Sequence, residues 1–296
     1  MELRHLRYFA AVAECGSFRL AAERISLTQP AITRQIHDLE DTLGVRLFDR
    51  SPQGVKLTAE GALFLEEVRK VLGMLESAVR SVKLVASGLR GTLRVGVVEN
   101  ASWDGIVPDA FSLFQREARE VAIHVAPMNT PEQFAALVDG TLDGGFVYTW
   151  GELPRGLSVM PLALGDVVAA VPRDWDWPAG DTIAARELNG RPLVCFPRQT
   201  YPAYHDTLVA ACHAAGLTLN VVQEVPTEAA ILSLVSAGVG AAIVNAANLG
   251  RPPARARFLR FEDLSVGMPL AFAYVASNPN AALQRLLRVL ESMPRA

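Results

Sequence analysis

The stretch from Ser17 to Gly44, SFRLAAERISLTQPAITRQIHDLEDTLG, constrains the fold more than any other part of the chain. Apolar residues recur at helical spacing in two runs, which the polar turn Ser26-Leu27-Thr28 separates. Ser17 suits the N-cap of the first run. Pro30 suits the first turn of the second, where its missing N–H is no loss. The spacing predicts two short helices joined by a tight turn, with an amphipathic helix over residues 2–14 before them.

The second of these helices has an apolar stripe, with Ile32 and Ile36 at its centre, and polar groups at its start and on its outer face. Such polar groups can bond base edges or phosphates, and the N–H groups of a helix N-terminus can bind a phosphate. A solvated helix face would have similar residues, but the helix-turn-helix spacing favours DNA binding. The candidate DNA-contacting residues are Thr28, Gln29, Pro30, Thr33 and Arg34.

Two short runs with alternating apolar residues follow, VRLFDR (45–50) and VKLT (55–58), around the turn sequence SPQG. Alternation on either side of a Pro/Gly turn predicts a small hairpin, or wing. Arg50 and Lys56 flank the turn. As part of a winged helix-turn-helix we expect both side chains to contact the DNA phosphate backbone, although single surface charges are common.

The run AAERISLTQPAITRQIHDLEDTLGVRLFDRSPQGVKLTAEG resembles the signature of LysR-type transcriptional regulators. Thr28 and Thr33 stand where that family usually has Ser, and both keep the hydroxyl. The resemblance implies a winged helix-turn-helix DNA-binding domain over residues 1–58. It also implies double-stranded DNA as a partner, RNA polymerase as a further one, and a ligand-controlled regulator as the function.

Residues 59–90 predict a linker and dimerisation helix followed by a hinge. Apolar residues from Phe64 to Leu89 recur at alternating spacings of four and three, which marks one long stripe. A helix of this length spans roughly 45 Å and needs a partner for its apolar face. We expect pairing with a second copy rather than with its own chain. The family resemblance agrees, because its linker helix dimerises, and it implies tetramers as well.

From Thr92 onward strands alternate with helices, and the first strand–helix–strand units predict a parallel sheet with crossover helices. We expect an effector-binding domain over 91–296 with two α/β lobes. Lobe I covers about 91–162 and 267–296, and lobe II about 163–266. This two-lobed architecture resembles periplasmic-binding proteins. The segments DGTLDGGFVY and LVSAGVGAAIVNAA are similar to segments of the LysR-type sensor, with Asn245 in place of the usual Pro. A helix is expected over Thr130–Asp139 with Thr130 as its N-cap.

Ligands of such folds lie at the carboxyl ends of strands, beside helix N-termini. Three segments meet this condition, each directly after a predicted strand. They are residues 99–102, 129–130 and 196–204. The spacing from Phe196 to Asp206 is similar to the family branch that controls aromatic-compound degradation through muconate-like effectors. The resemblance implies an aromatic or unsaturated carboxylate as the effector, with Asn100 and Ser102 as alternatives in the first loop. The candidate effector-binding residues are Asn100, Ser102, Thr130, Arg198, Thr200, Pro202 and Tyr204.

The sequence has no common catalytic motif, and its His and Cys residues have no metal-site spacing, so we expect neither an enzyme nor a metal or other cofactor. A redox-sensing regulator that uses Cys195 and Cys212 remains the alternative. A solute-binding protein is disfavoured by the N-terminal head and by the lack of a signal-peptide core in MELRHLRYF. We expect a cytoplasmic protein without a membrane span. Residues 1–90 carry 13 Lys and Arg against 11 Asp and Glu, so DNA affinity would rest on a few well-placed cations.

Overall fold

The chain divides into two compact units, Met1–Leu84 and Val85–Ala296. In the computed structural model the described residues are 1–51, 54–101, 105–177 and 180–294. None of the helices in this described part is long and apolar enough to cross a membrane.

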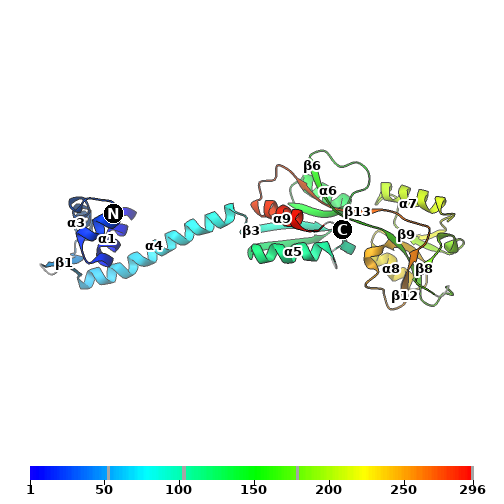
Figure 1. Cartoon of the computed structure of the whole chain (residues 1–296), viewed down its shortest axis with the longest axis horizontal. Helices are drawn as coiled ribbons and strands as arrows, with labels where there is room; N and C mark the ends of the chain where they lie inside the picture. The colour runs from blue at the N-terminus through cyan, green and yellow to red at the C-terminus, as the bar shows by residue number, and fades with distance from the viewer. Residues whose placement is uncertain (52–53, 102–104, 178–179, 295–296) are drawn as a thin grey trace. The chain divides into compact units, whose positions relative to one another are not determined.

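The first unit is a helical head with a hairpin, and one long helix extends from it (Figure 1). Phe9 lies at the centre of its core, with its ring centroid 5.2 Å from that of Phe48 and 5.1 Å from that of Phe64. The elements are α1 (Leu3–Cys15), α2 (Phe18–Arg24), α3 (Gln29–Leu43), β1 (Phe48–Ser51), β2 (Gly54–Leu57) and α4 (Ala59–Ala86). The predicted helix-turn-helix, wing and linker helix are confirmed.

The wing is fixed to its neighbouring helices by hydrogen bonds between side chains and backbone groups. Glu40, near the end of α3, accepts bonds from the backbone N–H of Leu47 at 2.7 Å and of Phe48 at 3.2 Å. Thr58 accepts a bond from the N–H of Gly61 at 2.9 Å and donates one to the Arg46 carbonyl at 2.8 Å. The wing and the start of α4 are therefore both tied to the loop that follows α3.

The second unit contains a five-stranded sheet with the order β4-β3-β5-β13-β6. Helices α5 (Ile106–Glu117) and α9 (Ala281–Ser292) cover one face, and α6 (Thr130–Val138) covers the other (Figure 1). Phe146 and Phe272 are fully buried under the first pair of helices. The strands are β3 (Arg90–Val97), β4 (Glu120–Pro127), β5 (Gly144–Tyr148), β6 (Leu157–Gly165) and β13 (Met268–Val275).

A second sheet, of order β11-β7-β12-β8, lies between α7 (Pro202–Ala214) and α8 (Glu228–Ser236). A parallel pair, β9 with β10, adjoins it through a bridge between Leu193 and Ala241. The chain passes between the two larger sheets twice, after β6 and before β13. The strands are β7 (Val167–Pro172), β8 (Thr182–Ile183), β9 (Leu193–Cys195), β10 (Val221–Glu224), β11 (Ala242–Asn245) and β12 (Ala256–Phe261). Short 3₁₀ turns at Glu99–Ala101, Ala185–Leu188 and Ala246–Asn248 complete the fold.

The parallel pairing expected of the first three strands is confirmed, since β3 runs parallel to both β4 and β5. The whole sheet is mixed, because β13 runs antiparallel to both β5 and β6 when the chain returns from the second sheet. One local expectation was wrong. The N-cap of α6 is Asn129 and not Thr130, since the Asn129 side chain accepts the bond from the N–H of Glu132. The Thr130 hydroxyl instead accepts a bond from the N–H of Tyr148 at 3.2 Å.

Candidate functional site

The start and outer face of α3 form the first candidate site. Thr28, Gln29, Pro30 and Arg34 are exposed, and Thr33 is half-buried. The Thr28 side chain makes no capping bond to the first turn of α3, so the N–H groups of this turn are not used by a side-chain cap. Among the described residues, no hydrogen bond or ion pair of the Arg34 guanidinium is present. The face therefore presents hydroxyl, amide and guanidinium groups together with a helix N-terminus.

The wing carries the second set of predicted DNA contacts. Lys56 is exposed on β2 and pairs in register with Asp49 on β1. Arg50 pairs in register with Val55. The Arg50 side chain lies outside the described part of the structure, so only its backbone position is known.

The second candidate site is a cavity of about 500 Å³ in the second unit. Its walls come from the segments that follow β3, β4, β5, β9 and β10, together with the end of β11 and the start of β13. This is the place where α/β folds bind ligands. The lining residues are Val98, Glu99, Pro127, Met128, Asn129, Glu132, Tyr148, Trp150, Phe196, Tyr201, Tyr204, Pro226, Thr227, Glu228, Asn245 and Met268.

The three predicted loops do reach the cavity, but mostly through other residues than those predicted. Tyr204 lines it, whereas Thr130, Arg198, Thr200 and Pro202 do not belong to the lining. Ser102 lies outside the described residues, and so does the side chain of Asn100. The loops contribute Glu99, Asn129, Phe196 and Tyr201 in their place.

Arg198 is bonded away from the cavity to Asp206 in α7. Its Nε lies 2.8 Å from one Asp206 carboxylate oxygen, and its terminal nitrogen lies 2.7 Å from the other. The bonds from Arg198, with one from His205, lower the pKa of Asp206 to about 2. The guanidinium is therefore engaged in a surface ion pair at neutral pH.

One wall of the cavity, formed by Tyr148, Glu228 and Asn245, was not predicted from the sequence. A buried network of hydrogen bonds holds it together. The N–H of Asn245 donates to the Glu228 carboxylate at 2.9 Å, and its side-chain amide donates to the Tyr148 hydroxyl at 2.7 Å. Asn248 donates to the same Glu228 oxygen at 2.8 Å. The family segment that this stretch resembles usually has proline at position 245. Proline has neither a backbone N–H nor a side-chain amide, so it could donate neither of the two bonds that Asn245 donates. The rule that ligands lie at the carboxyl ends of strands would also have indicated Tyr148, which ends one strand, and Thr227, which follows another.

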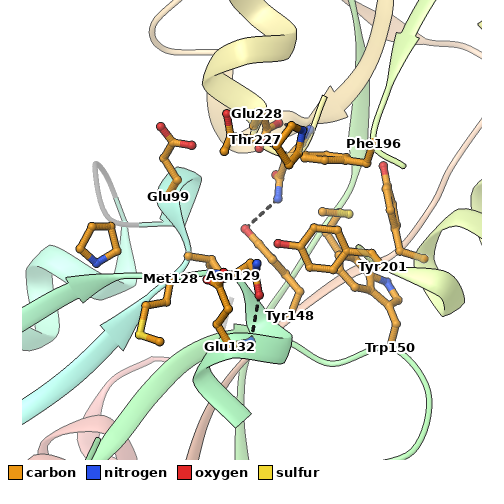
Figure 2. A pocket seen from close by; sticks show the side chains of 16 residues that line it. Glu99, Met128, Asn129, Glu132, Tyr148, Trp150, Phe196, Tyr201, Thr227 and Glu228 are labelled. Atoms are coloured by element: carbon orange, nitrogen blue, oxygen red, sulfur yellow. Dashed lines mark hydrogen bonds between the residues drawn. The ribbon is translucent and has the colours of Figure 1, made fainter. Parts of the chain in front are cut away.

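The cavity has a continuous aromatic wall (Figure 2). The Trp150 ring centroid lies 5.4 Å from that of Tyr148 and 4.6 Å from that of Tyr204. Tyr201 joins the wall at 6.3 Å from Trp150 and at 5.5 Å from Phe196. Such a wall can hold a flat apolar group or a cation over a ring face.

The cysteines and possible metal ligands offer no further site in the described part of the chain. Burial raises the pKa of the Cys195 thiol to about 11 and that of the Cys212 thiol to about 12. Both groups are therefore protonated thiols at neutral pH, which is the less reactive form. No group of three or more His, Cys, Asp or Glu among the described residues is arranged to hold a metal ion.

Both units match known protein families. Residues 3–62 match the family model of the bacterial regulatory helix-turn-helix proteins of the lysR family, and residues 86–294 match that of the LysR substrate binding domain. The transcriptional regulator TfdS of Cupriavidus pinatubonensis is 33% identical over 299 residues, which cover 98% of this chain and 97% of TfdS. ClcR of Pseudomonas putida is 37% identical over 253 residues, which cover 82% of each chain.

Solved structures agree with these matches. The crystal structure of CbnR, a LysR family transcriptional regulator, has a TM-score of 0.85 and 30% identity, and the match covers 98% of this chain and 100% of CbnR. Full-length CbnR in complex with its target DNA has a TM-score of 0.81 and 28% identity, with 98% of this chain and 99% of CbnR covered.

Proposed function

Because the chain belongs to the LysR family of bacterial transcriptional regulators, we propose that α3 and the wing bind a two-fold-related DNA site under the control of a small molecule in the aromatic cavity. The protein is a DNA-binding, effector-responsive regulator and not an enzyme. The observation that carries the proposed contacts is the exposed start of α3, where Arg34 has no partner among the described residues.

Base recognition is assigned to the start and outer face of α3. Arg34 can bond two acceptors on a guanine edge, while Gln29 can bond an adenine edge. Thr28, Pro30 and Thr33 lie on the first turns of the same helix, where N–H groups favour a phosphate. Lys56 and Arg50 of the wing are assigned to the phosphate backbone, where contacts add affinity without sequence preference.

This assignment predicts different effects for two cations. Arg34→Ala should weaken binding to the specific site by about 1–3 kcal/mol and relax the preference at one base pair. Lys56→Ala should weaken binding to all sequences alike and reduce the salt slope of the affinity by about 1. Mobility-shift titrations at several salt concentrations would measure both. Arg116→Ala is the matched control, because Arg116 is an exposed arginine on α5 of the second unit.

If Arg34→Ala binds the specific site as well as the unchanged protein does, α3 is not the helix that contacts the bases. If Lys56→Ala leaves the salt slope unchanged, the wing does not contact the phosphates.

We further propose a homodimer through α4, with tetramers formed by the second unit. The support is an exposed apolar stripe on α4 that includes Met74, Val79 and Val82. A dimer would present two heads to two half-sites. Since the regulator acts on DNA at promoters, we also assign it to the cytoplasm and expect contact with RNA polymerase.

The cavity is proposed as the effector site. The sequence resemblance favours an aromatic or unsaturated carboxylate there, and the aromatic wall supports the aromatic part of that hypothesis. The carboxylate part has less support, because Arg198 is bonded to Asp206 outside the lining. The redox alternative has less support still, because Cys195 and Cys212 have raised thiol pKa values.

A further inference from the structure

The charge of the cavity lining is negative. Glu99, Glu132 and Glu228 belong to the lining, and none of the described lining residues is Lys, Arg or His. Figure 2 shows Glu99 on the opposite side of the view from the rings of Phe196 and Tyr201. An anionic ligand in this cavity would meet these carboxylates, and burial strengthens such repulsion.

Three helix starts border the cavity, those of α6, α7 and α8, and the starts of α6 and α8 do not change this balance. Asn129 accepts a bond from the N–H of Glu132 at 2.9 Å, and Glu132 returns one to the Asn129 N–H at 3.0 Å. At the start of α8, Thr227 accepts a bond from the N–H of Ala230 at 3.2 Å. Each helix also carries its own glutamate, Glu132 or Glu228, in the first turn. The positive ends of α6 and α8 are therefore already faced by side chains of the protein, whereas the start of α7 has no side-chain cap and no acidic residue in its first turn.

The aromatic wall lies within the field of these carboxylates. Desolvation is the main cause that raises the pKa of Tyr201 to about 12, and the charges of Glu132, Glu228 and Glu99 add to the rise. Burial is also the main cause of the raised pKa of Tyr148 and of Tyr204, and the charge of Glu228 adds to both. Electron-rich ring faces and negative charges thus border the same cavity.

The Tyr204 hydroxyl provides an independent sign that a polar ligand atom belongs there. The Tyr204 side chain is only 4% exposed and lines the cavity. Among the described residues no hydrogen bond of this hydroxyl is present. This hydroxyl is not among the fully buried polar atoms that lack a partner, so it is open to the cavity, where it can accept a bond from an N–H group of a ligand.

We propose that the effector is a small organic cation, an aromatic or aliphatic ammonium compound held over the rings of Trp150, Tyr201 and Tyr204 with its charge facing Glu99 and Glu228. This inference rests on the proposed function in one respect, that the cavity is the effector site. Aromatic faces attract cations within about 6 Å of the ring centroid, most strongly where water is excluded. A volume of about 500 Å³ suits a ligand of this class.

Calorimetry on the full-length protein tests the charge directly with four small probes that share one phenyl ring. Benzyltrimethylammonium and benzylammonium carry a positive charge, benzyl alcohol is neutral, and benzoate is negative. We expect binding of the two cations at least tenfold tighter than binding of benzyl alcohol, and no detectable binding of benzoate. Glu99→Gln should weaken binding of both cations at least fivefold. Glu152→Gln, an exposed glutamate outside the lining, should change nothing.

A second variant distinguishes a loss of charge from a loss of folded protein. Glu99→Lys should abolish binding of the cations and create binding of benzoate, which a misfolded protein could not do. Benzoate binding by the unchanged protein, or equal binding of the cations and benzyl alcohol, would overturn the proposed charge. So would the failure of all probes. Mobility shifts with the same samples test DNA binding separately, so a wrong effector class leaves the assignment of α3 and the wing intact.

Discussion

At the residue scale, Asp143 joins two strands through a buried carboxylate. It accepts bonds from the Arg94 backbone N–H at 2.8 Å and from the Arg94 guanidinium at 3.2 Å. Burial by itself raises the pKa of Asp143, but the bonds from Arg94 outweigh it and hold the pKa below its ordinary value. The charged form therefore stabilises the fold above about pH 4, the ordinary pKa of Asp.

Asp143→Asn should lower the free energy of unfolding by about 2 kcal/mol at pH 7, a value reduced from that of a fully buried pair because Arg94 is partly exposed. The difference from the unchanged protein should shrink as the pH falls below 4, where the native carboxylate also becomes protonated. Chemical denaturation at pH 7 and at pH 3 measures both values. A difference that stays constant over this range would exclude the carboxylate charge as the cause.

The same scale explains why the sequence predicted the loops that border the cavity better than the side chains that line it. Arg198 follows a strand and carries a charge, so its position suggested a ligand contact. Its partner Asp206 lies eight residues further on in α7, and only the direction of this helix brings the two together. Tyr204 differs because the helical period itself turns it inward, next to Leu208 and Cys212 on the buried face of α7.

At the scale of elements, the helices were predictable from their apolar period and, for α2, from its N-cap residue Ser17. The direction of β13 was not, since this strand pairs with β5 and β6 only after more than a hundred residues of the second sheet. The wall formed by Glu228, Asn245 and Tyr148 depends on the same long-range return. No local pattern links Asn245 to Tyr148, 97 residues earlier in the chain.

Gly61 marks the contact between α4 and the loop after α3. A Cβ atom at this position would lie 2.0 Å from the Leu47 carbonyl oxygen, and backbone on both sides would have to move. We expect Gly61→Ala to lower the free energy of unfolding of the head by about 1–3 kcal/mol, the range for overpacked cores. Thermal unfolding followed by circular dichroism measures this loss.

Gly73→Ala, in the same helix, is the matched control. Nothing lies within 4 Å of a Cβ atom placed there, so the better helix propensity of alanine should stabilise α4 by up to about 1 kcal/mol. Equal effects of the two substitutions would mean that the Leu47 contact does not fix the start of α4.

At the scale of the whole molecule, α4 has two different parts. Its first turns belong to the core of the head through Leu65 and Val68, which are buried. Beyond them Met74 is 66% and Val82 is 69% exposed. An apolar stripe that continues past its own core is typical of a helix that pairs with a second copy. The pairing would join two heads and so double the number of DNA contacts.

Val79→Glu combined with Val82→Glu should therefore give monomers, because two carboxylates per chain would be buried in the helix pair without partners. Sedimentation velocity would measure the mass in solution. Affinity for a two-fold DNA site should fall by at least a hundredfold, since linked heads gain about 10²–10⁴ in avidity, while affinity for a single half-site should stay unchanged. Ser77→Glu, on the polar face of the same helix, should leave the dimer intact. If the double variant is still a dimer, the second unit forms the dimer interface and the apolar stripe of α4 does not.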